Sequence, residues 1–534
     1  MNLVSIYKEV KTRLNGEDRP LIDDVLKSIQ ESSKPFLYIV RAPTGYGKTV
    51  ISISCSIYSV FDSSLFPKVV HILPMRSIVE DVQYRASKIL DEAVKSKMMD
   101  VKEDELEVFH SFPLNITTVD TFTWDIMKLN TRKIKLIREE KEFGYDFLTQ
   151  GSLLDSLLFF DEAHYILEDE NMKTVFSIVL ELILRYKTSL IISTATLSKG
   201  YEEYFAWLAQ AHGYEFNIFE PDSLDPFIKK EREKQFDIHL VDNKGDILPK
   251  IKNCINLDKV NLIVVNSPYT AVRVYDEITA LGEAQTFLLH GNMKKTHRKQ
   301  VLEEVRKVFK NKNPSVIITT QVIEAGVDIS SNILITEVSV AQSLLQRMGR
   351  VARYDENSAD IYILKSKGEP YPSDKIEKTW TWLKRNSSSL HPRIPSLYYQ
   401  WLNEVHGKNM EQINPKYSLS NSPLLKELSI KLLDLYTRSP EILRQIEKIL
   451  THRPFLREFT IPIKVDDEYI LFSPIEVKKM FQDKSIEVKI NGECINAIPD
   501  FSKILEIAKV IALGVKAVEV NYQKVYDNVR GIIP

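Results

Sequence analysis

The residues best suited to chemistry lie in the segment Ala42 to Thr49, which reads APTGYGKT. It follows a short apolar run, Phe36 to Val40, and precedes an apolar stretch of helical pattern. Glycines let backbone N–H groups approach anionic oxygens, and the free N–H groups at the start of a helix complete a cradle for phosphate. The strict pattern has Gly where this sequence has Ala42. We therefore expect a nucleotide to be held by Ala42, Pro43, Thr44, Gly45, Tyr46, Gly47, Lys48 and Thr49, with Lys48 on the β and γ phosphates and the Thr49 hydroxyl on Mg²⁺.

A second group of reactive side chains, Asp161 to His164 (DEAH), follows the apolar run Leu157 to Phe160. Hydrolysis of a nucleotide needs one carboxylate that holds Mg²⁺ and a second that takes the proton of the attacking water. Asp161 and Glu162 fit these two roles. Two acids after a strand are more often a solvated loop when they stand alone, but a phosphate loop in the same predicted sheet favours the catalytic interpretation.

A third group is the arginine-rich segment Gln346 to Arg353 (QRMGRVAR). An arginine supplied from outside the nucleotide domain stabilises the charge that develops during phosphoryl transfer. On a helix, Arg350 and Arg353 would lie one turn apart and face the same side. A solvated helix face that includes Arg347 is the alternative, but the preceding Gln346 and the intervening Gly349 favour a role at the γ phosphate.

The elements that must position these groups form an α/β pattern. Apolar runs without alternation, typical of parallel strands buried on both faces, alternate with amphipathic stretches before residue 220 and again from Leu262 onward. The charged segment EPDSLDPFIKKEREK separates the two halves. Beyond residue 386 the pattern changes to a helical stretch at about Pro423 to Leu450 and alternating runs at Phe459 to Val465 and Ile486 to Ile490. We expect a first domain at 1–219, a linker at 220–234, a second domain at 235–385 and a smaller C-terminal α+β accessory region at 386–534.

Composition narrows the class of protein. The 534 residues include 71 Lys and Arg against 73 Asp and Glu, a net charge of -2 that argues against general electrostatic attraction to nucleic acid but not against a local groove. The three cysteines, Cys55, Cys254 and Cys494, lie far apart, which argues against zinc ribbons and iron–sulfur clusters. No stretch approaches 18 consecutive apolar residues, so we expect a cytoplasmic protein without a membrane partner.

APTGYGKT followed by DEAH resembles the first core domain of a superfamily 2 helicase, and the later motifs follow in the family's order. His71 to Asp81 resembles motif Ia, and Thr117 to Thr121 the next loop that contacts nucleic acid. Matches to motifs III, IV, V and VI lie at Ser193 to Leu197, Val264 to Ala271, Ile317 to Ser330 and Gln346 to Arg353. The sequences TQVIEAGVDI and SLLQRMGRVAR are similar to those of the helicase of type I CRISPR interference.

This resemblance implies two tandem RecA-like domains, ATP and Mg²⁺ as cofactors, and single-stranded DNA, or alternatively RNA, as the track along which the protein moves. It implies catalytic roles for Lys48, Asp161, Glu162, His164, Gln346, Arg350 and Arg353. Motif V places Gly326 and Asp328 near the nucleotide. Thr49 and Asp161 are the implied Mg²⁺ ligands, and the implied nucleic-acid contacts are Pro74, Arg76, Thr121, Thr319 and Thr320.

Many members of this family carry an amino-terminal HD nuclease domain, whereas no His-Asp dipeptide occurs in this sequence and about 40 residues precede the phosphate loop. The chain therefore resembles the stand-alone helicase subunit of type I-A systems. Its implied partners are a separate HD nuclease subunit and a guide-RNA surveillance complex. A general DEAH-type RNA or DNA-repair helicase and a non-catalytic nucleotide switch are the alternatives.

Three features have two interpretations each. Tyr46 could stack on a base or pack inside the domain. Lys294 to Lys312 could attract nucleic acid or form a solvated helix face. His290 and His297 could form a metal pair, although no carboxylate lies at ligand spacing.

Overall fold

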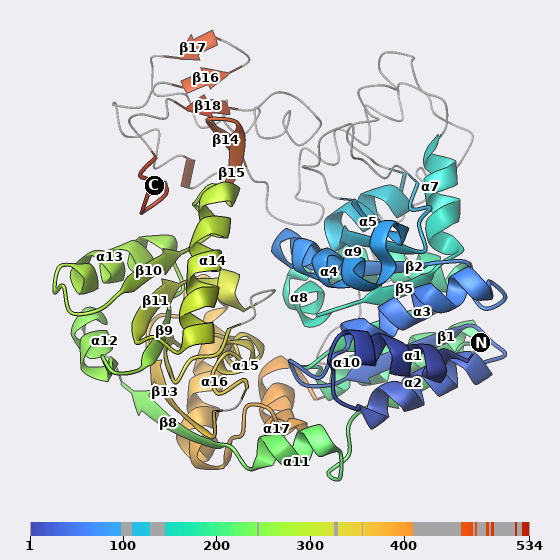
Figure 1. The fold of residues 1–534 in the computed structure, drawn as a ribbon, viewed down its shortest axis with the longest axis horizontal. Helices are drawn as coiled ribbons and strands as arrows, with labels where there is room; N and C mark the ends of the chain where they lie inside the picture. The colour runs from blue at the N-terminus through green and yellow to red at the C-terminus, as the bar shows by residue number, and fades with distance from the viewer. Residues whose placement is uncertain are drawn as a thin grey trace. The chain divides into compact units, whose positions relative to one another are not determined.

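The computed structural model describes residues 2–97, 109–128, 145–242, 245–324, 329–354, 356–408, 461–473, 476–477, 488–490, 493–495, 518–520 and 526–532. The chain divides into two compact units, each with its own parallel sheet (Figure 1). The first unit contains Met1–Arg232 and Arg393–Arg457, and the second contains Glu233–Pro392 and Glu458–Pro534. Their first boundary falls inside the predicted linker at 220–234. None of the helices in the described part of the chain combines the length and apolar character needed to cross a lipid bilayer.

The first unit is built on a seven-stranded parallel sheet with the order β3-β4-β2-β5-β6-β1-β7. β1, β2, β5 and β6 are buried along their whole length, which explains their predominantly apolar sequences and confirms the strands predicted there. The strands are β1 (Phe36–Arg41), β2 (Val69–Leu73), β3 (Val94–Lys97), β4 (Leu114–Thr118), β5 (Leu157–Phe160), β6 (Leu190–Thr194) and β7 (Glu215–Phe219).

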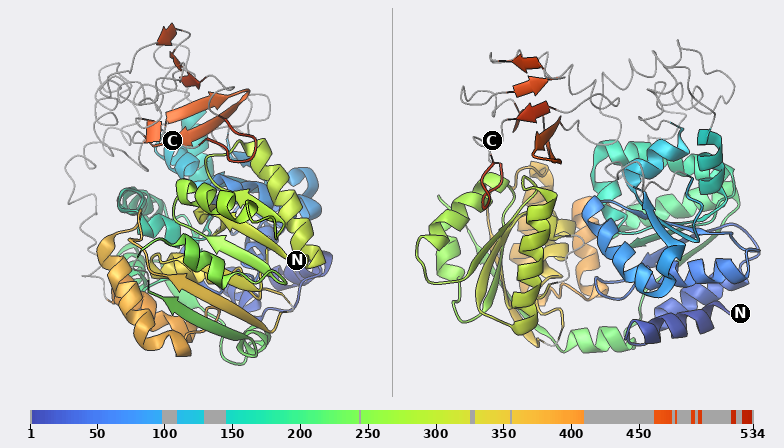
Figure 2. Two further views of the ribbon diagram at one scale, coloured as in Figure 1. Left: turned by 90° about the vertical axis from the view of Figure 1, so that its left-hand side faces the viewer. Right: turned by 45° about the horizontal axis from the view of Figure 1, so that its top comes forward.

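Helices flank this sheet (Figures 1 and 2). Two of them show how the sequence sets the boundaries. The Thr118 hydroxyl accepts from the Thr121 N–H and so caps α5, and α10 ends at Gly213, whose φ of 68° favours glycine. The helices are α1 (Leu3–Arg13), α2 (Pro20–Glu31), α3 (Thr49–Phe61), α4 (Arg76–Leu90), α5 (Val119–Ile126), α7 (Tyr145–Leu154), α8 (His164–Glu168), α9 (Glu170–Arg185), α10 (Lys199–His212) and α11 (Pro226–Arg232).

The second unit repeats the plan with a six-stranded parallel sheet of order β10-β11-β9-β12-β13-β8. Figure 2 shows its strands lying between α13 and α14. Its strands are β8 (Gln235–Val241), β9 (Val260–Val264), β10 (Thr286–Leu289), β11 (Ser315–Thr319), β12 (Ile333–Glu337) and β13 (Ser358–Leu364), and its helices are α12 (Leu248–Cys254), α13 (Pro268–Thr279), α14 (Lys295–Asn311), α15 (Ala341–Met348) and α16 (Ser373–Asn386).

The residues after 386 differ from the single accessory region predicted at 386–534, because they are shared between the units. Helix α17 (Pro395–His406) packs in the first unit. There Arg393 forms an ion pair with Glu231 of α11 at 2.8 Å, and each side chain is only 3% exposed. Buried charge pairs join two segments firmly, because separating them would leave a charge without a partner.

The described residues from 461 onward belong to the second unit and include a small mixed sheet of order β15-β14-β18-β16-β17. Its strands are β14 (Ile461–Val465), β15 (Glu468–Phe472), β16 (Val488–Ile490), β17 (Glu493–Ile495) and β18 (Val518–Val520). β14 and β16 fall within the two predicted alternating runs, whereas the other three strands were not predicted. Glu468 and Asp466 contact Thr296 and Lys294 of the α14 region. The helical stretch predicted at 423–450 lies outside the described residues.

The Arg393–Glu231 pair yields a stability prediction. Glu231→Ala leaves Arg393 buried without its carboxylate, and we expect the local opening free energy of α17 to fall by about 3–5 kcal/mol. Amide hydrogen exchange of α17 and α11 peptides in the full chain measures this change. Replacing both residues with Met should restore most of the protection, because no charge is then left unpaired.

The exposed pair Lys252–Glu277, at 2.9 Å, is the matched control. Glu277→Ala should lower the local opening free energy around its own helix by at most about 1 kcal/mol, because solvent screens such pairs. Equal losses of local opening free energy in Glu231→Ala and Glu277→Ala would contradict the packing of residues 393–406 on the first unit.

Candidate active site

The strand order of the first sheet brings three predicted motifs together. β6 lies between β5 and β1, so the residues that follow these three strands share one edge of the sheet. Backbone hydrogen bonds join them directly: the Ala42 N–H donates to Thr194 O at 3.3 Å, and the Ala163 N–H donates to Ser193 O at 3.1 Å. The phosphate loop, the DEAH segment and the STATL segment thus form one connected site.

The phosphate loop has the backbone that its glycines predict. Gly45 and Gly47 have φ values of 88° and 98°, a region that side chains rarely adopt. The Lys48 Nζ donates to Ala42 O at 3.0 Å and lies 3.8 Å from Glu162 Oε1. Thr49 begins α3, so the free N–H groups of the first helical turn follow the loop. The structure therefore brings Lys48 and Thr49 to the same place as the DEAH acids.

Tyr46 packs inside the first unit. Its ring is 1% exposed and makes an edge contact with Phe227, with centroids 5.4 Å apart. Its hydroxyl donates to Asp225 Oδ2 at 2.6 Å, and burial raises the pKa of Tyr46. Of the two interpretations of Tyr46, the structure supports internal packing.

Asp161 is a buried carboxylate held by neighbours from two strands. The Ser193 hydroxyl at the end of β6 donates to Asp161 Oδ1 at 2.8 Å, and the His71 Nε2 in β2 lies 3.5 Å from Asp161 Oδ2. Burial alone would raise the pKa of Asp161, but His71, Lys48 and Ser193 outweigh it and hold that pKa below its ordinary value. Asp161 is therefore ionised at neutral pH.

Neither His71 nor Ser193 has an individual role in the predicted motifs. His71 Nδ1 hydrogen bonds the Ser52 hydroxyl of α3 at 2.7 Å, so His71 links the helix after the phosphate loop to Asp161. The available signal was a polar residue within the otherwise apolar strand VVHIL, where a buried imidazole needs partners.

Glu162 lies in a conformation that non-glycine residues rarely adopt, with a φ of 49°. Such strain occurs where surrounding contacts hold a functional residue in place. Glu162 Oε2 lies 3.4 Å from His164 Nδ1, which also lies 3.1 Å from the Thr194 hydroxyl. Burial, with help from Lys48, lowers the pKa of His164 to about 3, so His164 is neutral at physiological pH.

The donor set fits Mg²⁺ with a nucleotide. The Thr49 hydroxyl and the Asp161 carboxylate offer the hard oxygen ligands that Mg²⁺ prefers, and an ionised, buried Asp161 supplies negative charge for it. These two residues would hold the ion, which would neutralise phosphate charge when bound.

The expected nucleic-acid residues of the first unit have different surroundings. Pro74 is buried after β2, and Arg76 opens α4 with its side chain outside the described part. The Thr121 hydroxyl lies 3.0 Å from that of Thr118, within the cap of α5. Thr121 is thus fixed at a helix start, where free N–H groups face outward.

In the second unit, Thr319 ends β11 and Thr320 follows it. Both threonines are buried, and the Thr319 hydroxyl donates to Thr320 O at 3.4 Å. Gly326 and Asp328 lie outside the described residues. The structure therefore positions the start of motif V but not its later part.

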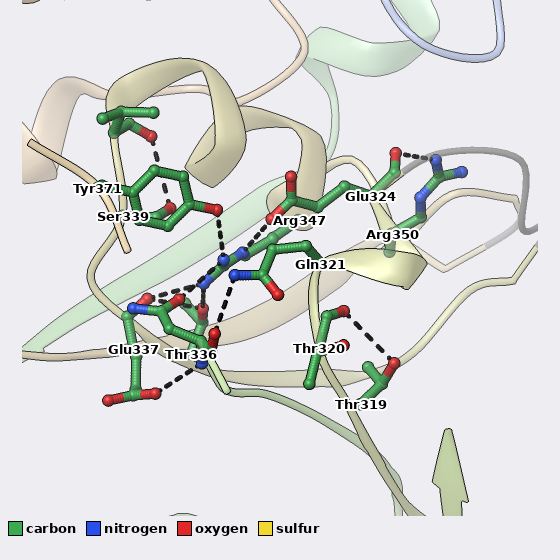
Figure 3. A network of polar contacts seen from close by, with 12 residues as sticks. Thr319, Thr320, Gln321, Glu324, Thr336, Glu337, Ser339, Arg347, Arg350 and Tyr371 are labelled. Atoms are coloured by element: carbon green, nitrogen blue, oxygen red, sulfur yellow. Dashed lines mark hydrogen bonds and ion pairs between the residues drawn. The ribbon is translucent and has the colours of Figure 1, made fainter. Parts of the chain in front are cut away.

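A buried arginine organises motifs V and VI of the second unit (Figure 3). Arg347 is 0% exposed, and its Nε donates to Glu324 Oε1 at 2.7 Å. Its other nitrogens donate to the Thr336 hydroxyl, Glu337 O, Asn266 Oδ1 and the Tyr371 hydroxyl at 2.9 to 3.2 Å. Burial alone would lower the pKa of Arg347, but Glu324 raises it, so the guanidinium stays charged. The solvated helix face proposed as the alternative for Arg347 is wrong.

The sequence predicted Arg350 and Arg353 one turn apart on a helix, and this prediction is wrong. Helix α15 ends at Met348 with Gly349 as its C-cap, and Ala352 has a φ of 44°. Arg350 is 4% exposed and donates to Glu324 O at 2.5 Å, whereas the Arg353 N–H donates to the Ser330 hydroxyl at 2.8 Å. Gln346, on α15 itself, is also buried. Motif VI is therefore a helix end followed by a turn.

His290 and His297 bond to the C-terminal segment rather than to each other. His290 Nε2 hydrogen bonds Arg530 O at 2.9 Å, and His297 Nδ1 hydrogen bonds the Tyr526 hydroxyl at 2.8 Å. In the described part of the chain, no group of three or more His, Cys, Asp or Glu residues is arranged to hold a metal ion. The exposed lysines of α14, such as Lys299 and Lys307, lie on one helix with the exposed Glu303 and Glu304, which fits a solvated face.

Comparison with protein families gives one match in each unit. The family described as DEAD/DEAH box helicase matches residues 23–204. The family described as the C-terminal part of the CRISPR-associated nuclease/helicase Cas3 matches residues 258–356. The two matches contain the phosphate loop, DEAH and STATL segments on one side and motifs V and VI on the other.

Curated relatives agree with these matches. The CRISPR-associated helicase Cas3 of Thermoproteus tenax is 26% identical over 355 residues, which cover 64% of this chain and 58% of the relative. The CRISPR-associated nuclease/helicase Cas3 of Methanothermobacter thermautotrophicus is 25% identical over 371 residues, 63% of this chain and 41% of the relative. The chain thus spans about half the length of these two relatives.

Solved structures show the same fold. The crystal structure of T. fusca Cas3 has a TM-score of 0.63 at 15% identity, covering 85% of this chain and 60% of that one. A chain of a CRISPR RNA-guided surveillance complex in a pre-nicking state has a TM-score of 0.55 at 16% identity, covering 79% of this chain and 55% of that one. The chain thus has two parallel-sheet RecA-like domains with a helicase-family match in each, and its sequence is similar to Cas3-like, CRISPR-associated helicases of the DEAD/DEAH-box class.

Proposed function

We propose that this chain is an ATP-dependent translocase or helicase that acts on single-stranded DNA in CRISPR interference. The observation that carries the proposal is the convergence of Lys48, Asp161 and Glu162 at the adjacent ends of β1 and β5, with Glu162 held at a left-handed backbone position. Such a cluster suits phosphoryl transfer to water, where positioning and charge stabilisation supply most of the rate.

Each side chain has a definite part in this reaction. Lys48 binds the β and γ phosphates, and Thr49 with Asp161 holds Mg²⁺, which neutralises phosphate charge when bound. Glu162 accepts the proton of the attacking water. His164 is neutral and bonded to Thr194, so it does not compete with Glu162 for that proton. The resemblance assigns Gln346, Arg350 and Arg353 to the charge that develops on the γ phosphate, and Gly326 and Asp328 to the nucleotide.

The bound nucleic-acid strand is proposed to contact threonine residues and the start of a helix. The proposed contacts to a phosphate backbone are Thr121, at the capped start of α5, Thr319, the last residue of β11, and Thr320, which follows it. Pro74 and Arg76 border the loop after β2. Such contacts position a strand without reading its sequence, and they need no excess of basic residues in a chain whose net charge is -2.

Substitutions in the cluster test the hydrolytic assignment. Lys48→Ala and Asp161→Ala should abolish hydrolysis with the fold intact, because both side chains serve the Mg-nucleotide. Glu162→Gln should retain nucleotide but hydrolyse it about 100-fold or more slowly, because the base is lost. Steady-state phosphate release and equilibrium nucleotide binding measure the two effects separately.

The matched control is Asp155→Asn, which removes an exposed carboxylate before β5, at the opposite end of the strand. It should hydrolyse ATP normally. Turnover by Glu162→Gln equal to that of Asp155→Asn would remove Glu162 from the mechanism.

Stimulation of ATP hydrolysis by nucleic acid tests whether the chain acts on single-stranded DNA. Because strand contacts favour the conformation competent for hydrolysis, single-stranded DNA should raise the rate of ATP turnover in the wild-type chain. The measurement compares DNA and RNA oligonucleotides of the same sequence at one salt concentration. An RNA that stimulates as well as or better than DNA would favour a general DEAH-type helicase instead.

The partners are also part of the proposal. The Thermoproteus tenax relative is named a helicase alone, whereas the Methanothermobacter relative is named a nuclease/helicase. This chain is proposed to work with a separate HD nuclease subunit and a guide-RNA surveillance complex. With Mg²⁺, Mn²⁺, Ni²⁺ or Co²⁺, the purified chain should translocate on DNA without cutting it, and cleavage should require both partners. Metal-dependent nicking by this chain, lost in a variant of its own residues, would contradict the separate nuclease.

A further inference from the structure

Helix α17 brings a segment from beyond the second unit back to the nucleotide domain. Residues 395–406 follow both family matches, which end at residues 204 and 356. Tyr398, Trp401, Leu402 and Val405, at helical spacing, are buried, so one face of α17 packs within the first unit. This helix is therefore part of that unit although it follows the second unit in sequence.

The packed face of α17 reaches the STATL loop, residues Ser193 to Leu197, which begins with the last two residues of β6. The Tyr398 side chain is 2% exposed, and its hydroxyl donates to Ala195 O at 3.0 Å. Ala195 lies at the middle of the loop. Burial raises the pKa of Tyr398, and the negative charge of Glu162 contributes to that rise, so the phenol lies within electrostatic range of the DEAH glutamate.

The other side of the same loop holds the catalytic cluster. Ser193 donates to Asp161, Thr194 Oγ1 bonds to His164, and Thr194 O accepts from the Ala42 N–H of the phosphate loop. The loop is thus fixed between the nucleotide residues and α17. A shift of Ala195 would move Ser193 and Thr194 relative to the acids that they hold.

A second residue of α17 holds the end of the loop. Ser198, the N-cap of α10, makes no capping hydrogen bond with its own side chain. Instead, Asn403 Oδ1 accepts from the Lys199 N–H at 2.8 Å and supplies the acceptor that a capping side chain would give. α17 therefore contacts both the middle of the loop and the start of the helix that follows it.

A third contact reaches the strand before the phosphate loop. The Arg41 guanidinium, at the end of β1, lies over the Tyr399 ring, 4.5 Å from its centroid, and forms an ion pair with Glu220 at 2.5 Å. The Tyr399 hydroxyl donates to Glu202 Oε1 at 2.8 Å. Tyr398 thus contacts the residues that follow β6, and Tyr399 contacts Arg41 at the end of β1.

We propose that α17 is a positioning element of the nucleotide site, and that Tyr398 sets the STATL loop through its hydrogen bond to Ala195 O. The role in hydrolysis rests on the proposed function, whereas the role in ordering the loop does not. Loss of the hydroxyl leaves a buried carbonyl unpaired, and the loop relaxes away from the arrangement that holds Asp161 and His164.

Tyr398→Phe removes only the hydroxyl and keeps the packed ring. We expect amides of residues 193–199 in the nucleotide-free chain to exchange at least about tenfold faster, because local opening becomes easier. The kcat for ATP should fall by about tenfold or more while KM stays within about twofold, because the catalytic groups are displaced but the phosphate loop is intact.

The matched control is Tyr214→Phe in the same unit. Tyr214 is also buried, and its hydroxyl donates to two backbone carbonyls, Ile183 O at 3.3 Å and Thr188 O at 3.0 Å, ahead of β6. Tyr214→Phe should reduce stability but leave exchange at 193–199 and kcat unchanged. Equal exchange at 193–199 in Tyr398→Phe and Tyr214→Phe would overturn the positioning role.

If Tyr398→Phe does not fold, a second pair of variants tests whether α17 orders the STATL loop. Asn403→Ala removes the acceptor for the Lys199 N–H, and Asn403→Asp keeps one. Faster exchange and lower kcat in Asn403→Ala, restored by Asn403→Asp, support the proposal, and wild-type values in both overturn it. A wild-type chain without ATP turnover would remove the proposed function, while the exchange result would still decide whether α17 orders the loop.

Discussion

The pairing of β6 with both β5 and β1 is the constraint on which the site depends. Parallel strands end at a common edge, so this order places the phosphate loop, the DEAH acids and the STATL loop side by side, although more than 150 residues separate Ala42 from Ser193 in the chain. The hydrogen bonds from the Ala42 and Ala163 N–H groups to β6 then fix their register. A different strand order would leave the same motifs intact but apart.

Burial and charge act together at this edge. Asp161 lies inside the domain and would favour protonation there, but His71, Lys48 and Ser193 keep it ionised. His164 is driven in the opposite direction, because burial and Lys48 disfavour a cation. The cluster thus contains a charged acid and a neutral imidazole three residues apart, and the charged acid is the kind of oxygen ligand that Mg²⁺ prefers.

The second unit uses a buried charge for a different purpose. Arg347 uses its rigid fork of donors to join motif IV through Asn266, motif V through Glu324 and strand β12 through Thr336 and Glu337. Arg350 bonds to the backbone of the same Glu324. Of the three motif VI arginines, Arg347 thus holds the motifs together, and it shares Glu324 with Arg350.

The sequence by itself determined the most apolar strands, such as β1, β2, β5 and β6, together with the phosphate loop and the acids, because an apolar run, glycines in a turn and carboxylates after a strand are local patterns set by burial, sterics and charge. It also predicted a linker at 220–234, a range in which the first unit ends at Arg232. It did not indicate β3, β4, β7 or β8. Only the tertiary structure decided that His71 holds Asp161, that Tyr46 packs inward, that α15 ends before Arg350, and that α17 returns to the first unit. These outcomes depend on contacts between residues distant in sequence, where packing competes with local preference, and no periodicity within a single segment contains that information.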